Sequence, residues 1–207
     1  MGDTLNALNR YAEAVTPLRK AIRLNPEYPY VYLYLGNSYY NSSQYSESVG
    51  PYEQAVYYKP DWSLAHFYLG DAYFQLKMYE PAASSYKEAT RLKPDYFEAF
   101  KALGNTYNEL EQYANAVSPL KQAARLDPKD ADVQFWLGNA YYNSNRFEDA
   151  VAPYEQAVRL KPDWAKAHFY LGDAYDKLKR VDEAVREYRE AIRLEPDDVN
   201  YHFNLGV

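Results

Sequence analysis

Three histidines, His66, His168 and His202, are the side chains of this 207-residue chain best suited to binding a metal. They are separated by multiples of 34 residues, so they occupy equivalent places in a regular pattern. Zinc binds imidazole nitrogens at about 2 Å, whereas the axes of packed helices lie about 8–10 Å apart. Equivalent residues on successive helices therefore cannot readily share one ion. We expect the histidines to serve in packing, and we expect no metal site.

Other groupings that could carry chemistry are sparse. The chain has no cysteine, which removes thiolate and disulfide chemistry. Its sequence shows no readable Ser-His-Asp arrangement and no glycine-rich phosphate-binding loop. The carboxylates are scattered in the way expected for the solvated faces of helices. The sequence predicts a protein that is not an enzyme and that needs no cofactor.

An internal repeat positions all of these residues. Proline recurs every 34 residues, and most of these prolines are preceded by Leu-Gly-x-x-Tyr, then Ala, then an aromatic residue or Leu. The Leu-Gly-x-x-Tyr residues have helical spacing and predict a first helix. The Ala and the aromatic residue or Leu that follow predict a second helix, which ends before the proline. The prolines are Pro26, Pro60, Pro94, Pro128, Pro162 and Pro196, and the Leu-Gly pairs begin at Leu35, Leu69, Leu103, Leu137 and Leu171.

Two local features refine this prediction. The turns between the two helices are rich in Asn, Ser and Gln, and we expect these side chains to satisfy exposed groups at the helix ends. Four further prolines fall inside predicted second helices, where each would remove a backbone hydrogen bond. We therefore expect a kink near the start of these helices, and a local change of curvature. These prolines are Pro17, Pro51, Pro119 and Pro153.

The pattern resembles the tetratricopeptide repeat, a helix-turn-helix unit of 34 residues, along essentially the whole chain. The resemblance implies an all-α fold: a right-handed superhelical α-solenoid of stacked helix pairs. Because stacked repeats share one core, it also implies a single solenoid over residues 1–207. The implied repeats are 1–28, truncated at its start, then 29–62, 63–96, 97–130, 131–164 and 165–198, with a partial repeat at 199–207.

Composition narrows the classes of partner and the compartment. The net charge is −6, and a nucleic-acid-binding surface would need clustered Lys and Arg. The sequence has no run of about 18 apolar residues and does not open with a signal peptide, so we expect no nucleic-acid partner and no membrane insertion. The chain begins at the seventh position of a repeat and reads as a fragment, so a targeting signal could lie outside it. Cytoplasm is the default expectation.

In the family that the chain resembles, first helices line a concave groove, and ligands contact positions 2, 5, 9, 12 and 13 of each repeat. The resemblance therefore implies a scaffold that binds an extended peptide segment of a partner protein. Aromatic residues would supply apolar contact, Asn would bond the peptide backbone, and Lys would attract negative charge. The predicted groove residues are Leu33, Asn37, Tyr40, Phe67, Asp71, Phe74, Lys101, Asn105, Phe135, Asn139, Tyr142, Lys166, Phe169 and Asp173.

One binding mode of the resembled family can be compared residue by residue. Some members hold the C-terminal carboxylate of a chaperone, and Lys101, Asn105 and Lys166 match that clamp. Trp136 and Tyr170 stand where the clamp has Asn and Arg, which removes the bidentate partner of the carboxylate. This mode is disfavoured. Aromatic rings with Asn and Asp would also suit a carbohydrate or a secretion-machinery ligand, which we retain as an alternative.

Head-to-tail self-association is the structural alternative. The partial repeat at the end of one molecule would nearly complete the truncated repeat at the start of another, and repeat ends without polar caps favour association. The contact would join Leu205 to a surface around Leu5, Leu8 and Leu18. The identity of a partner is not readable, because one repeat fold serves many functions.

Overall fold

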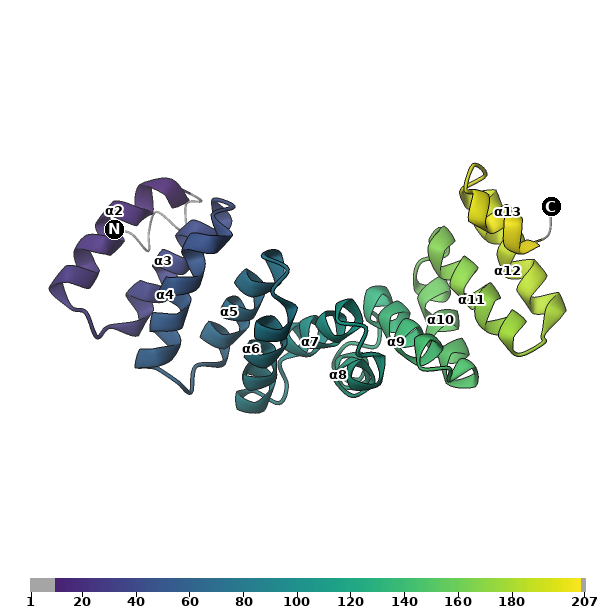
Figure 1. The fold of residues 1–207 in the computed structure, drawn as a ribbon, viewed down its shortest axis with the longest axis horizontal. Helices are drawn as coiled ribbons and strands as arrows, with labels where there is room; N and C mark the ends of the chain where they lie inside the picture. The colour runs from purple at the N-terminus through teal and green to yellow at the C-terminus, as the bar shows by residue number, and fades with distance from the viewer. Residues whose placement is uncertain (1–9, 206–207) are drawn as a thin grey trace. The chain divides into compact units, whose positions relative to one another are not determined.

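The computed structural model describes the backbone of residues 10–205 and the side chains of residues 10–203. Helix is the regular structure throughout this range (Figure 1). The all-α fold and the prediction of two helices per repeat are confirmed. The helices are α2 (Tyr11–Leu24), α3 (Pro29–Asn41), α4 (Tyr45–Tyr58), α5 (Ser63–Gln75), α6 (Tyr79–Leu92), α7 (Phe97–Glu109), α8 (Tyr113–Leu126), α9 (Ala131–Asn143), α10 (Phe147–Leu160), α11 (Ala165–Lys177), α12 (Val181–Leu194) and α13 (Val199–Leu205).

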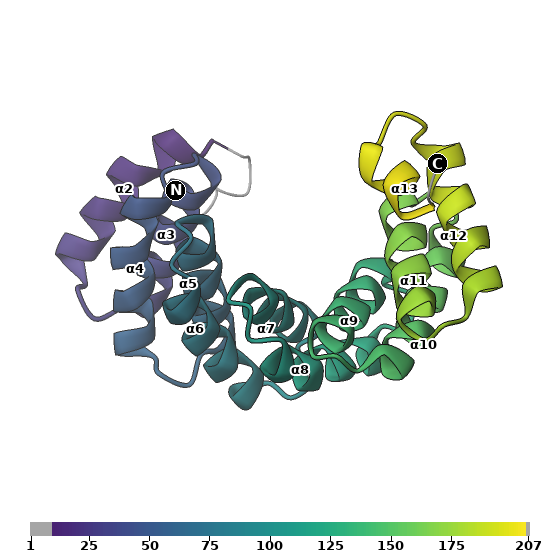
Figure 2. The ribbon, with the colours of Figure 1, turned by 45° about the vertical axis from the view of Figure 1, so that its right-hand side comes forward.

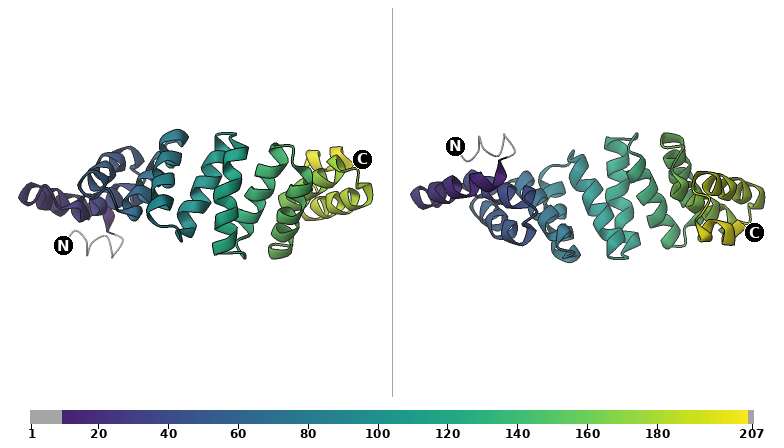
Figure 3. Two further views of the ribbon diagram at one scale, coloured as in Figure 1. Left: turned by 90° about the horizontal axis from the view of Figure 1, so that it is seen from below. Right: turned by 90° about the horizontal axis from the view of Figure 1, so that it is seen from above.

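The chain divides into two compact parts, Met1–Ala99 and Phe100–Val207. In the first part each helix from α2 to α6 packs on the next one along the chain. In the second part the same neighbour packing runs from α8 to α13, and Figures 2 and 3 show the successive pairs within each part from several directions. A single solenoid running through all 207 residues remains a prediction.

A close contact within each helix pair joins a glycine of the first helix to a large side chain of the second. A Cβ atom on Gly36 would lie 2.4 Å from Cε1 of Tyr52. Equivalent overlaps would occur at Gly70 with Tyr86, Gly104 with Leu120, Gly138 with Tyr154, and Gly172 with Tyr188. The glycine therefore sets how closely the two helices approach.

The turn after each first helix places one residue in the left-handed region of φ. These residues have φ between 56° and 62°, and they are Ser43, Lys77, Glu111, Asn145 and Lys179. The geometry returns main-chain N–H groups to the last carbonyls of the helix; Gln44 N, for example, donates to Tyr39 O at 2.9 Å. Asn41 and Asn143 add side-chain bonds to carbonyls there. The next helices start without side-chain caps at Gln44, Gln112 and Arg146, so the expected side-chain role holds only at the first-helix ends.

The fourth position of a repeat ties the first helix to the proline turn before it. Nε2 of His66 lies 2.9 Å from Pro60 O, and Tyr32 donates its hydroxyl to Pro26 O at 2.8 Å. His168 and His202 make the same contact with Pro162 and Pro196. The packing role predicted for the histidines is confirmed. Among the side chains of residues 10–203, no group of His, Asp and Glu is arranged to hold a metal.

The interior prolines do not end their helices. Each is the seventh residue of its helix, in the second turn, and α2, α4, α8 and α10 all reach 14 residues. This equals the length of α6 and α12, which have no proline at that position. A proline at this place therefore does not shorten the helix, and the kink with its local change of curvature stays a prediction. The helices described between residues 10 and 205 are also too short or too polar to cross a membrane.

Replacing Gly138 by Ala should destabilise the fold by about 1–3 kcal/mol, because its methyl group would overlap the buried Tyr154 ring. Gly50 on α4 is the matched control, since an added Cβ there meets nothing within 4 Å. Gly50→Ala should instead stabilise by about 0.5–1 kcal/mol through helix propensity. Urea unfolding followed by circular dichroism would measure both changes. Equal stabilities for the two variants would contradict the role given to the glycine.

Candidate functional site

The Asn and Asp side chains at position 9 of the repeats bond within the array. Tyr52 donates its hydroxyl to Asn37 Oδ1 at 2.8 Å, and Tyr154 donates to Asn139 Oδ1 at 2.6 Å. Tyr86 and Tyr188 donate in the same way to Asp71 and Asp173. The acceptor oxygen that the sequence assigns to a ligand therefore already satisfies a buried tyrosine. The amide nitrogens of the two asparagines are not part of this bond.

The residues at position 5 lie deeper than the groove prediction requires. Leu33 and Phe135 keep only 4% and 3% of their surface exposed. The Phe135 ring packs against Trp164 and Tyr154, with centroid separations of 4.5 and 5.8 Å. The side chains of Leu33 and Phe135 therefore cannot offer a broad apolar surface to a ligand, because neighbouring residues of the array cover them. Phe67 and Phe169 occupy the same position and remain partly exposed.

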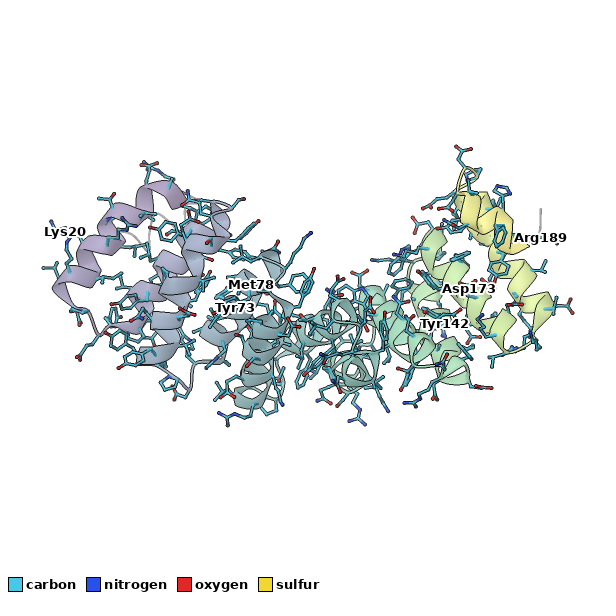
Figure 4. All side chains as sticks on the ribbon, in the orientation of Figure 1. Lys20, Tyr73, Met78, Tyr142, Asp173 and Arg189 are labelled. Atoms are coloured by element: carbon cyan, nitrogen blue, oxygen red, sulfur yellow. The ribbon has the colours of Figure 1, made fainter. Side chains whose placement is uncertain are left out.

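The aromatic residues at position 12 are half-buried at the edge of the helix pair. Tyr40, Phe74 and Tyr142 each pack against the aromatic residue that opens the second helix, at 5.1–5.3 Å between ring centroids. Burial, together with the nearby Asp173 and Asp176 carboxylates, raises the pKa of Tyr142 to about 12. Figure 4 marks Tyr142 on α9 and Asp173 on α11. Both line a pocket of about 330 Å³ with Asp176, Lys177, Tyr188 and Phe203.

The repeat at 97–130 departs from this pattern. Leu120 replaces the buried tyrosine, so among the described residues no tyrosine hydroxyl bonds to Asn105. Lys101 replaces the apolar residue found at position 5 of the other complete repeats, and its Nζ lies 2.6 Å from Asp130 and 3.7 Å from Asp132. The positive charge of Lys101 is therefore paired with carboxylates of the array. The sequence predicts that Lys101 attracts a negatively charged ligand, and the ion pairs leave it poorly placed to do so.

The third departure in this repeat is Asn108, which occupies the place of an aromatic residue at position 12. Its Nδ2 donates to the main-chain carbonyl of Trp136 at 3.2 Å. Its Oδ1 is buried and has no hydrogen-bond partner among the described residues. An unpaired buried acceptor is uncommon in folded proteins and requires a reason.

A polar pocket of about 340 Å³ opens at this repeat. Side chains from three successive first helices, α7, α9 and α11, contribute to it, together with the turn and second helix after α7. It brings together Asn105, Phe135, Asn139 and Lys166 of the predicted groove. The lining residues are Asn105, Asn108, Glu109, Glu111, Tyr113, Phe135, Trp136, Asn139, Asn143 and Lys166.

The remaining predicted residues are not part of this pocket. Lys166 and Phe169 also line a pocket of about 570 Å³ beside α13, with Tyr170 and Tyr201. Asn108, Tyr113, Trp136 and Asn143 are absent from the groove predicted from the sequence. The signal that could have found them is the departure of repeat 97–130 from the pattern of its neighbours: an amide, a lysine and a leucine stand where the other repeats are mostly aromatic.

Stacked helix pairs with a 34-residue period define the chain as a helical repeat protein. It belongs to the tetratricopeptide repeat family: the family described as the C-terminal domain of cilia and flagella-associated protein 70 matches residues 31–206, and the TPR repeat family matches residues 2–43. The family consists of protein-interaction scaffolds that typically do not catalyse reactions. No curated protein sequence matches the chain.

Solved structures share the fold. YrrB, described as a TPR protein with an unusual peptide-binding site, is 22% identical with a TM-score of 0.85, over 92% of this chain and 98% of that chain. MamA from Desulfovibrio magneticus RS-1 is 20% identical with a TM-score of 0.75, over 83% and 97%. MamA MSR-1 is 26% identical with a TM-score of 0.74, over 84% and 98%. These likenesses identify stacked helix pairs of the same kind.

Asp71 offers a test of the buried tyrosine contact, because burial raises the pKa of its carboxyl to about 6, although the bond from Tyr86 acts in the opposite direction. A folded-state pKa above the unfolded value stabilises the fold below about pH 4, and this contribution is lost as the pH rises through about 6. Asp71→Asn keeps an acceptor for Tyr86 and removes the buried charge. We expect it to raise the free energy of unfolding at pH 7 by on the order of 1–3 kcal/mol.

The gain from Asp71→Asn should shrink as the pH falls from 7 to 4, which urea unfolding at several pH values would measure. Asn139→Asp is the mirror control, because it introduces a carboxylate at the equivalent position beside Tyr154. That variant should lose stability at pH 7 and recover part of it at pH 4. An Asp71→Asn gain that is independent of pH would contradict the role given to the buried charge.

Proposed function

We propose that the chain is a non-catalytic interaction module that binds an extended peptide segment of a partner protein, with the polar pocket between α7, α9 and α11 as its central subsite. The observation that carries the proposal is this pocket, in which amide side chains from successive first helices face one cavity. Each amide offers a donor and an acceptor. An extended peptide presents both kinds of group at regular intervals and therefore suits such a surface.

Two further facts support a peptide ligand. The fold is shared with YrrB, whose structure is described as having a peptide-binding site, and the family supplies interaction scaffolds. Lys166 is exposed beside the pocket, with its Nζ 5.9 Å from the centroids of the Phe135 and Tyr170 rings. This lysine could attract a negative charge carried by the peptide, which Lys101 is poorly placed to do because it is paired with Asp130.

Selection of a random 12-residue peptide library against the chain would test the proposal. We expect enriched peptides whose affinity falls at least tenfold in Asn105→Ala, since one lost buried hydrogen bond to a ligand is of this order. Arg189→Ala, an exposed change on α12 (Figure 4), should leave the affinity unchanged. Absence of any enriched peptide, or equal binding by both variants, would contradict the proposal.

Stability must be controlled in this experiment. Asn105 receives no tyrosine hydroxyl among the described residues, so Asn105→Ala should unfold at the same urea concentration as the parent. Asn139→Ala is unsuitable as a binding variant, because it would leave the buried Tyr154 hydroxyl without its acceptor at a cost of about 1–3 kcal/mol. The bond from Tyr154 revises the expectation for Asn139, which the sequence predicts to bond the peptide backbone; the expectation for Asn105 is unchanged.

Self-association remains a second candidate function because α13 exposes an apolar surface. Val199 and Phe203 are 77% and 80% exposed. The predicted contact residues Leu5 and Leu8 and the side chain of Leu205 lie outside the described residues, and Leu18 is buried at 4% exposure, so it cannot contribute.

If α13 mediates association, the mass from light scattering should rise with concentration for the parent protein. A double change, Val199→Ser with Phe203→Ser, should then give monomer at the same concentrations, because the apolar area driving association is removed. A monomeric parent at high concentration would contradict this candidate.

A further inference from the structure

The second helix of repeat 97–130, α8, differs in charge from the second helices of the other repeats. It carries Lys121 and Arg125 and contains no Asp or Glu, whereas α2, α4, α6, α10 and α12 each contain at least one carboxylate. Lys121 and Arg125 are exposed, and because they are four residues apart they lie on the same face of the helix. One second helix of a chain with net charge −6 therefore carries only positive charge.

The neighbouring repeats show what α8 lacks. Arg91 of α6 and Arg193 of α12 occupy the place of Arg125, and each forms an ion pair of 2.6 Å with a glutamate three residues earlier. In α8 the residue at the place of that glutamate is Gln122. Among the described residues, neither Lys121 nor Arg125 forms an ion pair. The charges of both side chains are therefore available to a partner.

A pocket of about 610 Å³ lies along this face of α8. Arg146, the residue before α10, adds a third cation; its pair with Asp149 leaves both side chains about half exposed, and exposed pairs of this kind are weak. Phe100 and Val117 are partly buried and add apolar surface. No Asp or Glu of the described chain lines the pocket, whose lining residues are Phe100, Ala114, Val117, Ser118, Lys121, Gln122, Arg125 and Arg146.

Charge complementarity favours an acidic peptide as the ligand. The cations come from α8 and from the turn before α10, so they suit several carboxylates spaced along a chain better than one compact anion. Gln122 can bond a peptide backbone with its donor and its acceptor. A nucleic acid fits less well, because Glu148 and Asp149 follow Arg146 and the net charge of the chain would repel a long polyanion.

We propose that this pocket binds an acidic segment of a partner protein, with Lys121 and Arg125 pairing with its Asp or Glu side chains and with Phe100 and Val117 contacting an apolar residue. The site shares no lining residue with the pocket between α7, α9 and α11. It is therefore a second contact surface, which can bind independently of the peptide subsite proposed above. Individual surface ion pairs are weak and are screened by salt, so binding depends on several charges at once.

Selection of a random 12-residue peptide library, followed by fluorescence anisotropy of the synthetic peptides, tests this inference. We expect one enriched group that carries two or more Asp or Glu residues beside an apolar residue. The affinity of this group should fall about tenfold or more in the double variant Lys121→Glu/Arg125→Glu, because attraction becomes repulsion. It should also fall when NaCl is raised from about 50 to about 300 mM. Asn105→Ala, in the other pocket, should leave it unchanged.

The matched control is Lys87→Glu/Arg91→Glu, which makes the same changes at the equivalent exposed places of α6. It alters the net charge equally but lies outside the pocket, so acidic peptides should bind it within about twofold of the parent. Urea unfolding establishes that both double variants are folded; should the α8 variant unfold, Lys121→Gln/Arg125→Gln replaces it and should still weaken binding.

Three results would overturn the inference. The first is equal binding of acidic peptides by the two double variants. The second is binding of a single-stranded DNA oligonucleotide that is tighter than that of the acidic peptides and is lost in the α8 variant, which would make the pocket a nucleic-acid surface. The third is a selection that yields peptides dependent on Asn105 but no acidic group, which leaves the proposed peptide subsite intact. Absence of any enriched peptide overturns both proposals.

Discussion

The hydrogen bond from a buried tyrosine hydroxyl to an Asn or Asp on the first helix is the interaction on which each complete repeat but one depends. The tyrosine ring fits against a glycine that has no side chain to exclude it, and the hydroxyl reaches the next residue along the same helix. The tyrosine side chain thus fills the space between two helices, and its hydroxyl donates a hydrogen bond to the Asn or Asp. Burial of such a ring is favourable only when its hydroxyl finds a partner.

The repeat at 97–130 shows the consequence of losing this interaction. With Leu120 in place of tyrosine, the space is still filled, but Asn105 loses its internal partner. Lys101 and Asp130 replace an aromatic contact by an ion pair, and among the described residues the buried Asn108 acceptor is unpaired. A break in the packing pattern has become a polar pocket, and the proposed function uses this pocket as its central subsite.

Several features could be predicted from residue types and spacing. The 34-residue period, the Leu-Gly-x-x-Tyr set and the terminal prolines are local patterns that specify helix pairs, and the equivalent places of the histidines predict their packing role. The turn chemistry was harder to predict, because left-handed residues such as Lys77 and Glu111 are not typical of that conformation. Main-chain bonds hold these turns, and a composition rich in Asn and Ser does not reveal them.

The sequence by itself determined the class of fold, the repeat register and the absence of thiol chemistry, because these depend on periodicity and composition. It placed Asn139 and Phe135 on a groove, yet only the tertiary structure decided that Tyr154 occupies the acceptor of Asn139 and that aromatic neighbours cover Phe135. The tertiary structure also decided that Lys101 forms an ion pair with Asp130 and that no described residue donates a hydrogen bond to Asn108 Oδ1. Position within a repeat predicts which face a residue occupies, whereas the hydrogen-bond partner and the exposed area depend on side chains from other helices.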